Sequence, residues 1–133
     1  MKLLARRRQR RNRGERGSGG VAFLVVAAVL FFLLTTLIQY GIRLHANRLA
    51  EVAAREGAIA TARFDGSAEA GRSTAYDYVS TSGAVAIVDS SVTATRSPTQ
   101  AQVSVTVHMV SLAPWLSDPI TATATVPVER WVP

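Results

Sequence analysis

Cysteine is absent from this chain of 133 residues, and histidine occurs only twice. The missing thiols exclude disulfide scaffolds, thiolate metal sites and cysteine nucleophiles together. Neither His45 nor His108 has a second histidine or a carboxylate at the spacing of metal ligands. Asp77, Asp89 and Asp118 are isolated in the sequence, so we expect surface positions for them. The sequence therefore predicts no catalytic residue, metal site, cofactor or small-molecule substrate, and the protein is not expected to be an enzyme.

Basic charge is concentrated at the N-terminus. Residues 1–17 hold eight basic residues against Glu15, a net charge of +7, whereas residues 18–133 hold seven basic and eight acidic residues, a net charge of −1. The two parts add up to the formal net charge of +6. Because the larger part is almost neutral, the simplest interpretation is not a basic globular nucleic-acid domain.

A long apolar run follows this basic segment. Residues 17–42 carry no charge, and 13 of the 18 residues in Val21–Ile38 are Val, Leu, Ile or Phe. At 1.5 Å per residue, such a run spans about 27 Å, close to the thickness of the hydrocarbon core of a bilayer. A core helix of a small soluble domain would show a polar stripe, and this run has none. We predict a transmembrane helix over residues 18–40, with the lipid bilayer as its partner.

The flanking charges predict the orientation of this helix. Only Arg43, Arg48 and Arg55 follow the run within about 20 residues, which places the basic segment in the cytoplasm and the remainder outside a bacterial cytoplasmic membrane. A cleaved secretory signal is the alternative, but its apolar region normally has about 7 to 15 residues and ends at a small-x-small site. Leu44-His45-Ala46 matches that site poorly. We therefore expect a single-pass anchor.

The helix is expected to continue over residues 41–64, with a possible bend at Gly41. Its predicted buried face consists of Ile42, Ala46, Leu49, Ala53 and Ala60, at helical spacing. Glu51 and Arg55 are expected to form an i, i+4 pair on the opposite side. Phe64-Asp65-Gly66 should end this helix, and Ser67 should cap a second short helix that reaches about Val79.

The period then changes from that of a helix to that of strands. Alternation of apolar and polar residues predicts strands at 101–109 and 120–128, and an apolar, β-branched segment at 84–96 predicts another, irregular at Asp89-Ser90-Ser91. Ser97-Pro98-Thr99-Gln100 is typical of a turn, and Pro127 indicates an edge strand. We expect a membrane-anchored α+β fold, in which residues 65–133 form a small extracytoplasmic domain with a three-stranded antiparallel sheet that covers the long helix.

These features together resemble a known family. The basic N-terminus, the Arg16-Gly17-Ser18 junction, the apolar helix, the Ala53-Ala54-Arg55-Glu56-Gly57-Ala58 stretch and the β-rich end are similar to the TadE-like pseudopilins of the tight-adherence (Flp-type) pilus assembly system. The strand-forming segment Pro119–Thr125 is similar too. The resemblance implies cleavage between Gly17 and Ser18 by a membrane-embedded prepilin peptidase. The glycines at 14, 17, 19 and 20 form no phosphate-binding loop, because neither a preceding strand nor a following Lys-Ser/Thr is present, and we expect an accessible, flexible peptide there.

One position departs from the prepilin pattern. Type IV prepilin-like proteins usually carry Glu at the fifth residue after the cut and an aromatic residue at the sixth, whereas this chain has Ala22 and Phe23. In such proteins the carboxylate compensates the N-terminal ammonium of a neighbouring subunit, since an unpaired ion in lipid is costly. The resemblance therefore implies a minor, priming or tip position, or a chain that is never processed, rather than the main pilus subunit.

The two tryptophans leave several interpretations open. Trp115 and Trp131 suit a membrane-interface belt, but the favoured interpretation is that both side chains pack on the long helix. A further hypothesis is that Leu112, Pro114, Trp115 and Leu116 form an exposed patch that contacts another pilus subunit.

The leading functional interpretation is a TadE-like minor pseudopilin, a structural component of a type IVb (tight-adherence) pilus or related secretion machinery at the cell surface. Its expected partners are other pilins and pseudopilins, the pilus assembly platform and, if the chain is cleaved, the prepilin peptidase. The alternative is an uncleaved bitopic membrane protein whose arginine-rich tail binds anionic lipid or nucleic acid at the cytoplasmic face. Topology alone also explains the tail, so nucleic acid is the less favoured partner.

Overall fold

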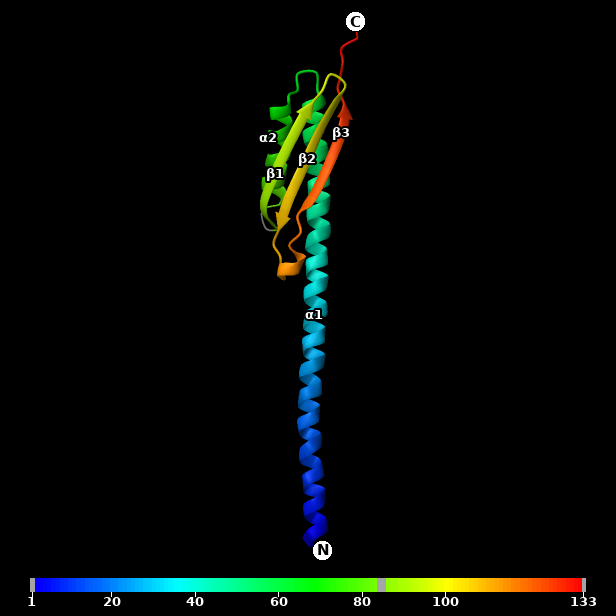
Figure 1. Cartoon of the computed structure of the whole chain (residues 1–133), viewed down its shortest axis with the longest axis vertical. Helices are drawn as coiled ribbons and strands as arrows, with labels where there is room; N and C mark the ends of the chain where they lie inside the picture. Colours follow the sequence, from blue (N-terminus) through cyan, green and yellow to red (C-terminus); the bar gives the residue numbers. More distant parts are fainter. Residues whose placement is uncertain (1, 84–85, 133) are drawn as a thin grey trace. The chain divides into compact units, whose positions relative to one another are not determined.

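The computed structural model describes residues 2–83 and 86–132, with side chains described from Gly17 onward. Its elements are α1 (Lys2–Ala62), α2 (Ala68–Ser82), β1 (Ile87–Arg96), β2 (Gln100–Met109), the 3₁₀ helix η1 (Pro114–Leu116) and β3 (Ile120–Pro127) (Figure 1). The chain divides into two compact units, Met1–Ile38 and Gln39–Pro133. The second unit, called the head below, holds all the strands. The predicted α+β fold is confirmed, and the start of the predicted strand at residues 84–85 lies outside the described residues.

The first unit is helical from Lys2, so α1 begins well before the predicted transmembrane segment at residues 18–40. The expectation of a flexible peptide around Gly17 is wrong, because the helix runs through this glycine-rich segment. Arg, Leu, Ala, Gln and Glu are strong helix formers, and each glycine in a helix costs only about 1 kcal/mol relative to alanine. The helix likewise runs through Gly41 without interruption.

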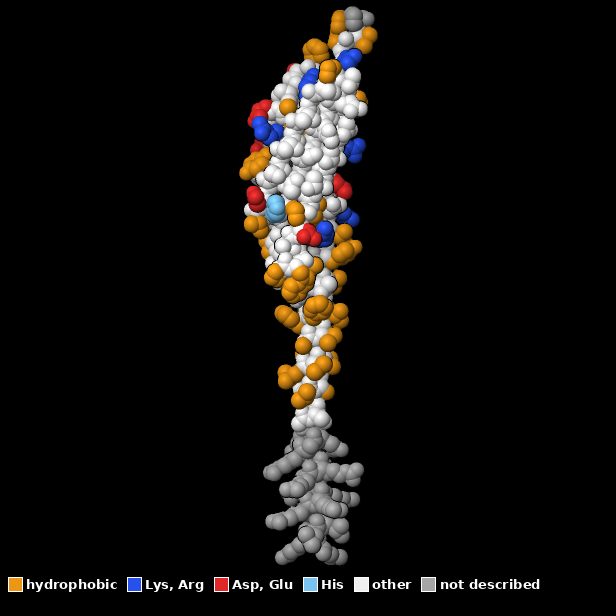
Figure 2. Space-filling model, viewed as in Figure 1, with side chains coloured by type: hydrophobic (Ala, Val, Ile, Leu, Met, Phe, Trp, Pro, Cys, Tyr) orange, Lys and Arg blue, Asp and Glu red, His pale blue; other side chains and the backbone are white. Residues whose placement is uncertain are grey.

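Large apolar side chains cover the helix over residues 21–38 and are exposed. Figure 2 shows apolar side chains along the visible face of this segment. Phe23 and Phe31, for example, are both 72% exposed. The hydroxyls of Thr35 and Thr36 donate to the carbonyls of Phe31 and Phe32 at 2.9 and 2.8 Å, so these polar groups are satisfied within the helix. The segment is long and apolar enough to cross a bilayer, and it is compatible with single-pass membrane anchoring.

The head contains an antiparallel sheet in the order β1-β2-β3, as predicted. β3 is an edge strand and holds Pro127 at its end, which confirms that prediction. The irregularity of β1 lies between Ile87 and Asp89, slightly earlier than expected. Figure 1 shows the strands side by side, with α2 behind β1 and β2. The outer side of the sheet is polar, and hydrogen bonds pair Ser104 with Thr123 at 2.7 Å and Thr106 with Thr121 at 3.0 Å.

Small residues of α1 and alternate residues of β2 form the core of the head. Val103, Val105 and Val107 are fully buried and pack in one cluster with alanines of α1, namely Ala46, Ala50, Ala53, Ala54 and Ala58. The predicted helix face is largely confirmed, although Ile42 and Ala60 are only half-buried. Glu51 accepts a hydrogen bond from Asn47 at 2.8 Å rather than pairing with Arg55. Burial of apolar surface in this cluster is the main driving force for the folding of the head.

Two glycines allow α1 and α2 to approach each other closely. A Cβ on Gly71 would lie 1.7 Å from Thr61 Oγ1 and 2.6 Å from the carbonyl oxygen of Gly57. A Cβ on Gly57 would lie 2.9 Å from Ala75 Cβ. The close approach of the two helices therefore requires glycine, which has no Cβ, at both positions. Ser67 caps α2 as predicted, since its hydroxyl accepts from the Ala70 amide at 3.1 Å.

A guanidinium group from the sheet closes the C-terminal end of α1. Arg96 Nη1 donates to the carbonyl of Thr61 at 2.6 Å, to that of Arg63 at 2.9 Å and to that of Gly66. The amide of Glu129 donates to the carbonyl of Ala62 at 2.9 Å. The last carbonyls of a helix lack partners inside the helix, and here other parts of the head supply them.

Candidate functional site

The predicted processing junction lies inside α1. Gly17 and Ser18 are both exposed, and a Cβ added to Gly17 would meet nothing within 4 Å. Packing within this chain therefore does not require glycine at position 17. A peptidase that cut here would have to open the helix locally, because the peptide bond lies in helical backbone.

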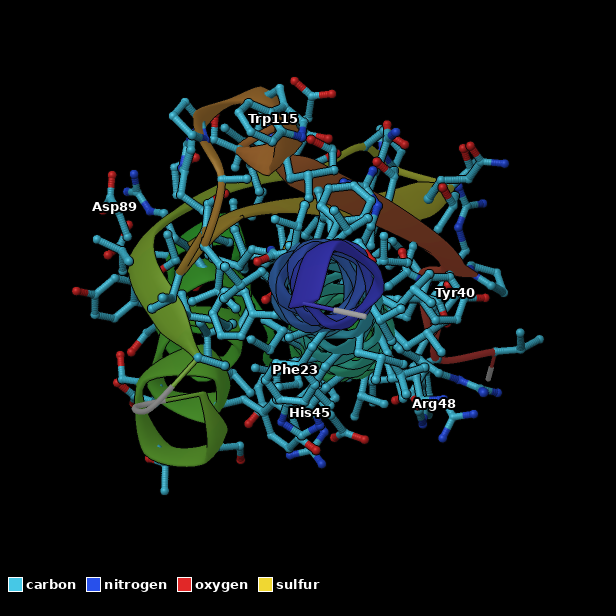
Figure 3. The ribbon with its side chains drawn as sticks, turned by 90° about the horizontal axis from the view of Figure 1, so that it is seen from below. Phe23, Tyr40, His45, Arg48, Asp89 and Trp115 are labelled. Carbon is cyan, nitrogen blue, oxygen red and sulfur yellow. The ribbon has the colours of Figure 1, made fainter. Side chains whose placement is uncertain are left out.

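Ala22 and Phe23, the fifth and sixth residues after the predicted junction, lie on the same exposed helix. Ala22 is exposed, and Phe23 projects away from α1 (Figure 3). Glu51 is the first acidic residue after Glu15 in the sequence. Residues 18–50 therefore contain no carboxylate that can compensate a positive charge at the start of a processed helix.

The motif at 53–58 is part of the core rather than a free surface. Ala53, Ala54, Gly57 and Ala58 are buried under the sheet and α2, whereas Arg55 and Glu56 are exposed. The small residues let neighbouring elements approach the helix, and the two charged residues keep the other side of it soluble. In this fold the motif packs the head's part of α1 into the core of the head.

The candidate patch lies in the loop between β2 and β3. Trp115 is 73% exposed, and Leu112 is 51% exposed. Pro114 is exposed as well, and Leu116 is half-buried. The favoured expectation that Trp115 packs on the long helix is wrong, and it is wrong for Trp131 too, which is 74% exposed. The buried side chain of this loop is that of Ala113, and the indole of Trp115 is left in solvent.

Gln39 holds this loop on α1, a role that sequence reasoning missed. Its amide Nε2 donates to the carbonyl of Val110 at 3.3 Å, and its Oε1 accepts from the amide of Leu112 at 2.9 Å. The Gln39 side chain is only 4% exposed, so both polar ends of a buried amide are satisfied by the loop backbone. The only available signal was a polar residue directly after the apolar run.

The titratable residues are dispersed. His45 and His108 are exposed on different elements, and so are Asp77, Asp89 and Asp118. Figure 3 shows Asp89 and Trp115 apart from each other, and His45 on the opposite side of α1 from Trp115. Within residues 17–83 and 86–132, whose side chains the structure describes, no group of three His, Asp or Glu side chains is arranged to hold a metal ion. The described surface thus offers apolar contact areas rather than a cluster of reactive groups.

These features define a class of protein with a small α+β head and an exposed apolar helix that is compatible with membrane anchoring. A family model described as TadE-like protein matches residues 17–58, about a third of the chain. The match runs from the predicted junction through the apolar run to the end of the 53–58 motif, and it confirms the resemblance for this segment. TadE-like proteins are pilus-related and structural rather than enzymatic. Comparisons with curated proteins and with solved structures give no match.

Proposed function

We propose that this protein is a minor pseudopilin, a structural component of a type IVb (tight-adherence) pilus or related secretion machinery. The observation that carries the proposal is the TadE-like match, which begins at Gly17 and covers the apolar run. In this proposal residues 1–17 are a cytoplasmic leader, residues 18–40 cross the cytoplasmic membrane, and residues 41–133 lie outside. The head performs no chemistry, and the protein acts by assembly.

The helix supplies the assembly surface in this proposal. Its side chains over residues 21–38 are exposed or half-buried, and large ones such as Phe32 and Leu37 are 60% and 67% exposed. Lipid covers them before assembly, and helices of neighbouring pilins replace lipid afterwards. This exchange gains little from hydrophobicity, since lipid tails are as apolar as leucine, so side-chain packing between helices provides the attraction. The partners are other pilins and pseudopilins and the assembly platform.

Ala22 favours a minor position in the assembly. A processed chain begins with an ammonium group next to the membrane, and no carboxylate in residues 18–50 compensates it. A filament built from such subunits would contain one unpaired ammonium group per subunit. A single subunit at a priming or tip position contributes only one, and the carboxylate of a different pilin can compensate it.

The test is the intact mass and the N-terminal sequence of the protein recovered from native membranes. A chain that begins at Ser18 supports prepilin-type processing. A chain that keeps its leader contradicts it and favours the uncleaved bitopic protein with an arginine-rich tail.

Two glycine variants make this test specific. Gly17 and Gly20 are both exposed, and a Cβ on either meets nothing within 4 Å, so substitution does not disturb packing in the chain. We expect Gly17→Leu to accumulate as the full-length chain, because the peptidase no longer fits the residue before the cut, and Gly20→Leu to be processed. Equal processing of both variants would refute the junction.

A further inference from the structure

We propose that the loop at residues 110–119 docks on the headgroup layer of the bilayer that the apolar helix crosses, so that the head has a second contact with the membrane. This inference rests on the membrane anchoring in the proposed function. The occupant of the Trp115 patch is then a phospholipid surface rather than another protein.

The first argument is the position of the loop. Gln39 directly follows Ile38, the last residue of the apolar run. The Gln39 side-chain amide binds the backbone of Val110 and of Leu112. The start of the loop is therefore bonded to the residue that directly follows the apolar run. Any placement of residues 21–38 in hydrocarbon brings this part of the loop to the boundary with the headgroups.

The second argument is the chemistry of the exposed side chains there. Leu112 and Trp115 are exposed on the loop, and Tyr40, on α1 next to Gln39, is 58% exposed. Trp and Tyr are enriched at membrane interfaces because one end of each side chain is apolar and the other forms hydrogen bonds. A solvated loop gains nothing from an indole in this position, whereas a loop at the interface does.

The third argument is charge. Arg43 is four residues beyond Gln39, or about 6 Å along a helix, and the headgroup layer of one leaflet is about 5 to 8 Å thick. Figure 3 shows Arg48 and His45 on the side of α1 opposite Trp115. Basic side chains are attracted to lipid phosphates. Asp118 is the one acidic residue within residues 39–50 and 110–119.

Trp131 shows that exposure alone does not carry this inference. It is as exposed as Trp115, but it follows β3 beside Phe64 and Arg96, at the end of the head where α1 ends. Along α1, Gln39 and Ala62 are 23 residues apart, or about 35 Å. The two indoles therefore make a matched pair, one at the proposed interface and one far from it.

The experiment measures tryptophan fluorescence of the full chain in vesicles of phosphatidylethanolamine and phosphatidylglycerol, with and without phosphatidylcholine brominated on its acyl chains. Trp131→Phe leaves Trp115 as the single reporter, and Trp115→Phe leaves Trp131. Both side chains are exposed, so neither variant should affect folding. We expect brominated lipid to quench Trp115 several-fold more than Trp131, and the emission of Trp115 to lie to the blue of that of Trp131.

Equal, weak quenching of both indoles overturns the proposal. Protection of Trp115 from aqueous iodide without quenching by brominated lipid also overturns it, because a protein then covers the patch. Phe31→Trp in a chain without the other two tryptophans reports membrane insertion separately. Strong quenching at position 31 without quenching of Trp115 rejects the docked loop alone, whereas no quenching at position 31 rejects the membrane anchoring on which both proposals rest.

Discussion

The two parts of α1 on either side of Gln39 are both helical and both carry apolar side chains, yet these side chains differ in size and position. Over residues 21–38 the side chains are large, and they are exposed on all sides. Over residues 46–62 the buried positions are mainly alanine, with Leu49, Gly57 and Thr61, and they occupy one side. Large side chains all round suit a fluid or exchangeable environment, whereas small ones on one side let α2 and the sheet come close. The size of the apolar side chains, more than their number, distinguishes the two parts.

The largest effect is expected where two backbones meet. Gly71→Ala places a Cβ against Thr61 Oγ1 and the Gly57 carbonyl, so the free energy of unfolding of the head should fall by about 3 kcal/mol or more. Gly41→Ala, whose Cβ would meet nothing within 4 Å, should instead raise it by about 0.5 to 1 kcal/mol. Urea unfolding of the full chain in detergent, followed by near-ultraviolet circular dichroism, measures both. Equal stability of the two variants would mean that α1 and α2 are not in close contact.

A charge in the apolar part should separate insertion from folding. Leu30→Arg makes membrane insertion less favourable by about 3 kcal/mol and leaves the head unchanged, because Leu30 is 60% exposed and has no packing role. Leu44→Arg, five residues past Gln39, should be tolerated. Alkaline extraction of membranes, compared with the circular dichroism of the head, measures this difference. If Leu30→Arg changed neither, the apolar run would not be in lipid.

Loss of the guanidinium at the end of α1 should have a smaller effect. Arg96→Met leaves the carbonyls of Thr61 and Arg63 without their donor and should lower the free energy of unfolding by about 2 kcal/mol. Arg72→Met removes only an exposed ion pair with Glu69 and should cost less than about 0.5 kcal/mol. Urea unfolding ranks the two variants, and a reversed order would contradict the role of Arg96.

Local signals predicted most of the fold. Ser67 as the cap of α2, the turn at residues 97–100 and the alternation in β2 and β3 each depend on residues close in sequence, and the structure confirms them. The hydroxyl of Ser97, for example, accepts from the Gln100 amide at 2.9 Å. The buried side of α1 was predicted for the same reason, since helical spacing is a local property.

The contacts that fix the candidate surfaces were not predictable in this way. Gln39 binds a loop that is more than 70 residues later, and Arg96 binds carbonyls 30 to 35 residues earlier. Neither residue type has a period or a spacing that reveals its partner. The exposure of Trp115 was missed because an aromatic residue in a proline-containing loop suits the core and the surface equally, and only the tether to Gln39 decides where it lies.

The bonds at Gln39 and at Arg96 have a mechanical consequence. They fasten the head's part of α1 near both of its ends, and the amide of Glu129 adds a further bond at the second end. Tension applied along this part of α1 is then shared between both fastenings, so that within residues 39–133 the helix cannot slide past the sheet one bond at a time.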